Sequence, residues 1–219
     1  MAEKAFERAW YGASEPTIGE KLKSLFKNDK EPLAKRAVMA NYRVRSALNR
    51  VRSYIDRINE RDKELFERAV ESLMRKDEAR AKIYVNEVAE IRKIARQLLT
   101  VEYVLEHASI RLDTFMIVGE AFTTVAPVVG ILKEAANILR GIAPDLWIDL
   151  NMAVSDLSTV MSAAGFDVGL GTEISMSPEA KKIFEEARIV AEQRLRERFP
   201  ELPATALAVG EQAGVQQGK

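Results

Sequence analysis

The sequence predicts an all-α protein, built on one long antiparallel helical hairpin that is followed by shorter C-terminal helices. Three observations support this fold class. Glycine and proline are rare, at 11 and 7 of 219 residues, and charged residues reach 30%, a balance that favours helix over sheet. No glycine or proline occurs between Pro32 and Gly119. Within that interval, apolar residues recur in alternating steps of four and three, which is typical of a long helix packed against another helix.

The first helix of the hairpin is expected over residues 33–74. Pro32 suits the start of a helix, because its fixed φ and missing N–H are tolerated in the first turn. At about 1.5 Å per residue, this helix would extend roughly 60 Å. Its apolar seam, the line of residues expected to face the second helix, consists of Val44, Leu48, Val51, Ile55, Ile58, Leu65, Ala69 and Leu73.

The second helix is expected to begin in the turn MRKDEA and to reach about Ala126, before Pro127. Asp77 can cap this helix, and Glu78 suits its first turn. Because two long seams are joined by a short link, the helices are expected to form an antiparallel hairpin over about 33–126. The second seam consists of Tyr84, Val88, Ile91, Ala95, Leu98, Leu105, Ala108, Leu112 and Phe115, with Glu102 or Val101 bridging its gap.

Shorter helices are expected after the hairpin, at about 127–142 and 145–164, which complete a helical core of residues 32–164. A C-terminal helix is expected over 178–199, since Ser177 can cap it and Pro178 suits its first position. The remaining segments are an N-terminal region, a flexible linker and a disordered tail that follows the last helix. They cover residues 1–31, 165–177 and 200–219.

The residue types present argue against an enzyme. Cysteine is absent, which excludes disulfides and thiolate metal sites and fits a reducing cytosol. A single histidine, His107, cannot supply a di-iron bundle, a histidine zinc site or a serine triad. Gly165, Gly169 and Gly171 lack the Lys-Ser/Thr that completes a P-loop. The sequence therefore predicts a protein without catalytic residues or a cofactor.

No segment is expected to cross a membrane. The longest uncharged run lies between Glu120 and Lys133 and has 12 residues, whereas a spanning helix needs about 20. A soluble protein is expected, which can still lie on a membrane surface. Phe6, Trp10 and Tyr11 fall near a single helical face and are a candidate membrane anchor. The alternative is an N-terminal segment that packs on the hairpin or remains free.

Charge is strongly segregated along a chain that carries 33 basic and 33 acidic residues. Residues 36–57 contain six arginines and one acidic residue, while residues 113–179 contain nine acidic residues and two basic ones. Four of the arginines are spaced by seven and continue in register with Glu64, Glu71 and Glu78, so this stripe reverses its sign. We call the six the arginine row: Arg36, Arg43, Arg50 and Arg57, with Arg45 and Arg52 on the other side of the seam.

The arginine row could bind three kinds of anionic partner, because guanidinium binds phosphate and carboxylate bidentately. These are anionic lipid headgroups, nucleic acid phosphates, and carboxylates of this or another copy of the chain. The alternative is a solvated helix face with coiled-coil flanking charges. Nucleic acid is not expected, since no recognised motif is present. Asp145, Asp149 and Asp156 share one stripe of the helix at 145–164. They are the candidate partner in a closed state that is released on assembly, unless they simply face water.

The segments EPLAKRAVMANYRVRSALNRVRSYIDRINERD, RAVESLMRKDEARAKIYVNEVAEIRKIARQLL and LLTVEYVLEHASIRLDTFM closely resemble ESCRT-III proteins, and more narrowly the archaeal cell-division branch, the CdvB family. The resemblance covers about residues 20–200 and includes the basic first helix and the acidic shorter helices. It implies a subunit that polymerises with itself and with paralogues on membranes, in archaeal cytokinesis and possible vesicle budding. The implied location is cytoplasmic, on the inner face of the cell membrane at the division site.

The resemblance also implies an ATPase partner. Family members are remodelled by an AAA ATPase that carries an MIT domain. The segment RFPELP, residues 198–203, is similar to the proline-rich motif that engages this domain, with Phe199, Pro200, Leu202 and Pro203 as the contacting residues. A proline-terminated helix followed by a tail is the alternative. The family's winged-helix domain has no counterpart in this sequence, so the chain looks like a shorter paralogue. A static coiled-coil scaffold without lipid activity is the competing function.

Overall fold

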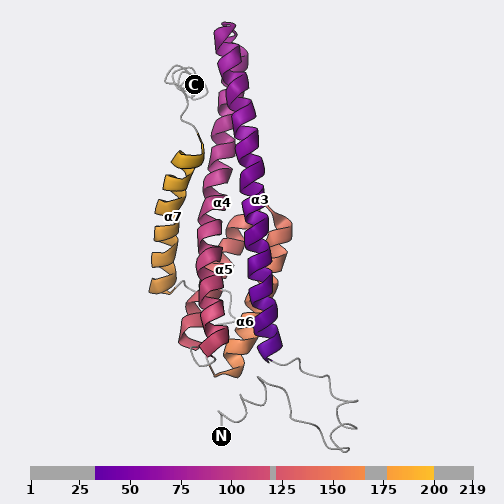
Figure 1. Ribbon diagram of the computed structural model, residues 1–219, viewed down its shortest axis with the longest axis vertical. Coiled ribbons are helices and arrows are strands. Elements are labelled where there is room, and N and C mark those ends of the chain that lie inside the picture. Colours follow the sequence, from indigo (N-terminus) through magenta and orange to yellow (C-terminus); the bar gives the residue numbers. More distant parts are fainter. Residues whose placement is uncertain (1–32, 119–121, 166–176, 200–219) are drawn as a thin grey trace, which may run out of the picture. The chain divides into compact units, whose positions relative to one another are not determined.

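The computed structural model describes residues 33–118, 122–165 and 177–199, and this part of the chain contains five helices and no strand. The all-α prediction is confirmed. The candidate anchor and three residues of the proline-rich motif lie outside the described residues: Phe6, Trp10, Tyr11, Pro200, Leu202 and Pro203. In chain order the helices are α3 (Leu33–Met74), α4 (Glu78–Val118), α5 (Phe122–Leu139), α6 (Pro144–Ala163) and α7 (Pro178–Arg198) (Figure 1).

The chain divides into two compact units, and the boundaries between them fall inside α3, α4 and α7. Among the described residues, the first unit comprises 33–47, 105–118, 122–165 and 177–183, and the second comprises 48–104 and 184–199. The first unit thus holds α5 and α6 together with the start of α3, the end of α4 and the start of α7. The second unit holds the hairpin turn between α3 and α4.

The hairpin turn of the second unit follows from its local sequence. The N–H of Lys76 donates to the carbonyl oxygen of Leu73 at 3.0 Å, and that of Asp77 donates to Ser72 at 2.9 Å. This pair of bonds defines a Schellman motif, which places Lys76 in the left-handed region at φ 58°. Asp77 then caps α4 as predicted, because its Oδ1 accepts the N–H of Arg80 at 3.1 Å.

The core of the second unit lies between the apolar seams of the two hairpin helices. The predicted seam residues Val51, Ile55, Val88 and Ala95 are all buried, and a cluster near the turn joins Ala69, Leu73, Tyr84 and Val85. In this unit, α7 also buries one side at steps of three and four, which is the period of a helix with one apolar face. Its buried residues are Phe184, Ala187, Ala191 and Leu195.

In the first unit, α5 and α6 pack against each other. α6 begins at Pro144 and buries Leu146, Leu150 and Leu157, close to the predicted range of 145–164. α7 begins as predicted, because the Oγ of Ser177 accepts the N–H of Ala180 at 3.1 Å. Arg111 of α4 donates to Glu179 at the start of α7, so a charge pair joins these two segments of the first unit.

The expected break at Pro127 is wrong. α4 ends at Val118, short of the predicted Ala126, and Pro127 lies inside α5. Pro127 is the sixth residue of α5, which begins at Phe122, so it lies just past the first four residues, whose N–H groups have no helical partner. Pro127 therefore removes about one backbone hydrogen bond, and the burial of Val125, Val128 and Val129 offsets that loss.

Candidate functional site

The arginine row begins in the first unit, where two of its members converge on one carboxylate of α6. Arg43 donates from Nη1 to Oδ2 of Asp156, and Nη1 of Arg36 lies 3.6 Å from Oδ1 of the same residue. Less than a third of each of these side chains is exposed. Of the predicted acidic stripe, Asp156 is thus the member that meets Arg36 and Arg43, while Asp145 is exposed and Asp149 half-buried on α6.

A third member of the row, Arg45, bonds within the first unit to α4. Its Nη2 donates to Oδ2 of Asp113 at 2.5 Å, while Nδ2 of Asn41 donates to Oδ1 of the same carboxylate at 2.9 Å. These two bonds, with that of Arg45 the larger cause, hold the pKa of Asp113 below its usual value. Asp113 therefore stays ionised and links α3 to α4.

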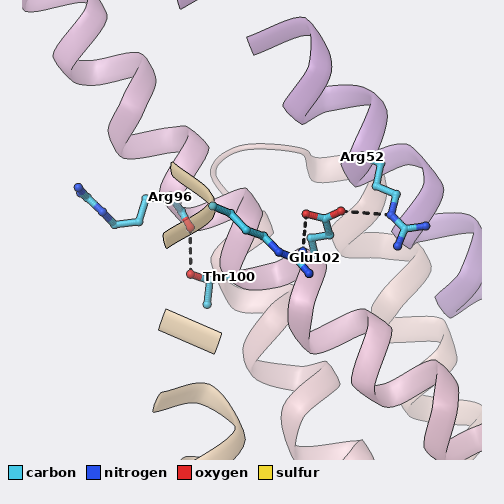
Figure 2. A network of polar contacts seen from close by, with 5 residues as sticks. Arg52, Arg96, Thr100 and Glu102 are labelled. Atoms are coloured by element: carbon cyan, nitrogen blue, oxygen red, sulfur yellow. Dashed lines mark hydrogen bonds and ion pairs between the residues drawn. The ribbon is translucent and has the colours of Figure 1, made fainter. Parts of the chain in front are cut away.

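In the second unit, the row meets a buried carboxylate on α4. Glu102, whose side chain is 3% exposed, accepts a bond from Nε of Arg52 at 3.2 Å and from Nη1 of Arg194 at 3.0 Å. Figure 2 shows Arg52 reaching Glu102 from the neighbouring helix, beside Thr100, whose hydroxyl donates to the carbonyl oxygen of Arg96. Because Arg52 belongs to α3 and Arg194 to α7, this one carboxylate connects three helices.

The last two members of the row also lie in the second unit. The guanidinium of Arg57 stacks over the ring of Tyr54 at 4.5 Å, a cation–π contact within α3. Arg50 is half-buried. Arg50 also interacts within the fold, and the carboxylates that bond to other members of the row include Asp113, Asp156 and Glu102.

A buried charge pair that the sequence interpretation missed joins α3 and α4 in the second unit. The side chain of Asp62 on α3 is fully buried and accepts two bonds from Arg92 on α4, at 2.8 Å and 3.0 Å. The signal was present, because Asp62 stands in the seam, four residues after Ile58 and three before Leu65. A charged residue at such a position needs a partner across the interface.

Phe199, the one described residue of the candidate proline-rich motif, is buried at the end of α7. Its N–H donates to the carbonyl oxygen of Leu195 at 2.9 Å, so it extends the last helical turn. His107 is half-buried on α4.

Across residues 33–118, 122–165 and 177–199, no helix has the length and apolar composition that a bilayer span requires. Within the same ranges, no three acidic or histidine side chains are arranged to hold a metal ion.

Comparisons with known proteins place the chain in a family. No family model and no solved structure matches it. It is 45% identical over 208 residues to Cell division protein B1 of Sulfolobus acidocaldarius, with 94% of each chain covered. It is 32% identical over 192 residues to Cell division protein B of the same organism, covering 84% of this chain and 72% of that one. Cell division protein B3 is 28% identical over 156 residues, with 71% and 90% covered. Together with the helical hairpin, these relatives show that the chain belongs to the CdvB family of archaeal ESCRT-III-like proteins.

Proposed function

We propose that the chain acts in archaeal cell division as a polymer-forming subunit that assembles on the inner face of the membrane and drives its constriction. The names of the three relatives support the cellular role. The observation that supports a lipid-responsive subunit is the shared carboxylate of Asp156, on which Arg36 and Arg43 converge. Two guanidinium groups around one carboxylate retain a net positive charge. A lipid phosphate can replace the carboxylate, since arginine binds both groups in the same geometry.

The free energies involved allow a lipid phosphate to replace the carboxylate of Asp156. A charge-assisted hydrogen bond that is mostly buried contributes about 1.5–3 kcal/mol, which is the order of the contact between Arg43 and Asp156. An anionic leaflet attracts each nearby basic side chain by about 1 kcal/mol. Three or more residues of the arginine row near a membrane would therefore offset the loss of Asp156. The contact keeps α6 on α3 in the closed state and yields when the helix meets an anionic surface.

Removing the Asp156 charge tests this proposal. Asp156→Asn should increase pelleting with anionic vesicles and the number of polymers seen by electron microscopy, because Arg36 and Arg43 are released. Asp56→Asn is the matched control, since it makes the same charge change at an exposed position of α3 and should have a smaller effect. The double variant Arg36→Glu, Arg43→Glu should lose vesicle binding. Wild-type behaviour of both test variants would count against the proposal.

A static coiled-coil scaffold is the second candidate, and one observation favours it. Arg45 and Arg52 are both used to join hairpin helices, through Asp113 and Glu102, which is what a purely structural role for the row would require. A scaffold would sediment equally with anionic and neutral vesicles, and salt would not change the result. A membrane subunit should bind anionic vesicles only, with an affinity that falls as salt rises.

An AAA ATPase with an MIT domain is the proposed remodelling partner, alongside paralogues that co-assemble. The docking segment would be RFPELP, and the buried ring of Phe199 would have to leave its packing before it could enter a groove on the partner. Titration of the full chain with the isolated MIT domain tests this, with a Leu202→Ala, Pro203→Ala variant for comparison. Equal binding of the variant, or no binding at millimolar concentration, would exclude the segment.

A further inference from the structure

In the first unit, one exposed face of α3 is apolar at its centre and basic at its rim. Val38 and Tyr42 are 47% and 66% exposed, and Met39 lies beside them at 36%. Lys35 and Arg45 flank these residues on the same face, because steps of three and four return to one side of a helix. We call Lys35, Val38, Met39, Tyr42 and Arg45 the basic-rimmed patch.

A second exposed apolar face belongs to α6 in the same unit. Ile148 and Met152 are 52% and 47% exposed and lie four residues apart, so they are neighbours on the helix surface. Asp145 and Asp149 occupy the same face, three residues before Ile148 and Met152 respectively. We call Asp145, Ile148, Asp149 and Met152 the acidic-rimmed patch.

The two patches complement each other in two respects. Each offers large apolar side chains to solvent, whose removal from water is favourable. Their rims carry side chains of opposite charge, and Arg45 remains 55% exposed while it pairs with Asp113. Opposite rims steer two surfaces together and disfavour the pairing of like patches. Since both patches are present on every copy of the chain, a second copy is a partner that always supplies the matching surface.

We infer that the basic-rimmed patch of one copy binds the acidic-rimmed patch of the next copy. The inference rests on the polymer proposed above and names the surfaces that would form it. A contact between two different patches leaves one of each unused on every dimer. It can therefore repeat without closing, which is the geometry of an open filament.

Two variants block opposite sides of this contact. Val38→Glu, Tyr42→Glu places negative charge in the basic-rimmed patch, and Ile148→Lys, Met152→Lys places positive charge in the acidic-rimmed patch. Each variant alone should need about tenfold or more protein for half-maximal assembly, since burial of two apolar side chains is lost. The matched control is Ile110→Glu, Ile117→Glu on α4, which alters two isoleucines that are 66% and 84% exposed and should assemble like the wild type.

Mixing the two variants gives the decisive measurement. Each retains the patch that the other has lost, so an equimolar mixture of the full-length chains should form one-to-one complexes, or an alternating polymer, by sedimentation velocity without lipid. A mixture that stays monomeric would overturn the inference, as would assembly of either variant at the wild-type concentration or an equal loss in the control. Circular dichroism of each variant excludes unfolding as the cause of any loss.

Two further outcomes separate this inference from the proposed function. If Val38→Glu, Tyr42→Glu assembles normally in solution but no longer pellets with anionic vesicles, the basic-rimmed patch contacts lipid and the inference is overturned while the membrane role stands. If the wild type forms no polymer with or without vesicles, the proposed polymer itself fails, and the contact between copies fails with it.

Discussion

Replacing Arg92 with methionine is expected to destabilise the hairpin by about 3–5 kcal/mol, because it leaves the carboxylate of Asp62 buried without its partner. The side chain of Asp62 is fully buried and that of Arg92 is 16% exposed. Both oxygens of Asp62 accept bonds from Arg92, so the substitution removes two charge-assisted bonds at once. Water cannot replace them at a site from which solvent is excluded.

Substituting the other partner, Asp62, should destabilise the hairpin less. Asp62→Leu leaves Arg92 with some access to solvent, and its long aliphatic stem can carry the charged group outward. We expect a loss of about 1–3 kcal/mol. The double variant Asp62→Leu, Arg92→Met places two apolar side chains in the seam. Its stability should lie within about 1 kcal/mol of the wild type, or above it, since apolar replacement of a whole buried pair is often neutral or stabilising.

Chemical denaturation, followed by circular dichroism as the helix signal, measures the free energy of unfolding of the wild type, the two single variants and the double variant. These four values form a double-mutant cycle, which gives the interaction energy between Asp62 and Arg92. The reasoning requires the double variant to be more stable than Arg92→Met. It would be refuted if Arg92→Met cost under about 1 kcal/mol, or if removal of Asp62 failed to restore stability to the Arg92→Met chain. The slope of the unfolding curve must match among variants for the comparison to hold.

Three further outcomes follow from local geometry. Lys76→Gly should stabilise the chain by about 0.5–1 kcal/mol in the same denaturation assay, because glycine adopts the left-handed φ of 58° without strain. Gly130→Ala inside α5 should gain about 0.5–1 kcal/mol of unfolding free energy, since the added Cβ would lie 3.8 Å from that of Ala180, an ordinary contact; a loss would reveal tighter packing. The bonds from Arg45 and Asn41 lower the pKa of Asp113, so their stabilisation is complete above the unfolded value of about 3.9 and is lost as the pH falls through the folded value. Asp113→Asn should therefore flatten the acid limb of a stability–pH curve, and an unchanged limb would contradict this.

Sequence reasoning located closely those elements whose bounds depend on residues that are near one another in the chain. α3 occupies Leu33–Met74, the range predicted from its uninterrupted seam. The caps at Asp77 and Ser177 form as predicted, because a cap depends on a side chain and a backbone N–H three residues later. Pro127 was the exception, since its tolerance depends on where α5 begins and on the packing around it.

The partners of the arginine row, in contrast, could not be predicted from the sequence. The seven-residue spacing of the arginines predicted their common face, but it could not show that Arg43 meets Asp156 or that Arg52 meets Glu102. Those partners are 113 and 50 residues away in the chain. Their positions depend on which helix faces pack together, and this information is absent from the periodicity of any single helix.

The amino-acid sequence by itself therefore determined the all-α fold class, the extent of α3, the turn between the two long helices and the family, because periodicity, caps and residue similarity are read locally along the chain. Only the tertiary structure decided which charges are used inside the fold and which apolar side chains remain exposed. It buries Asp62 and Glu102 and leaves Tyr42 exposed. The physical reason is that the cost of burying a charge, or of exposing an apolar ring, is set by neighbours that the fold brings from distant parts of the chain.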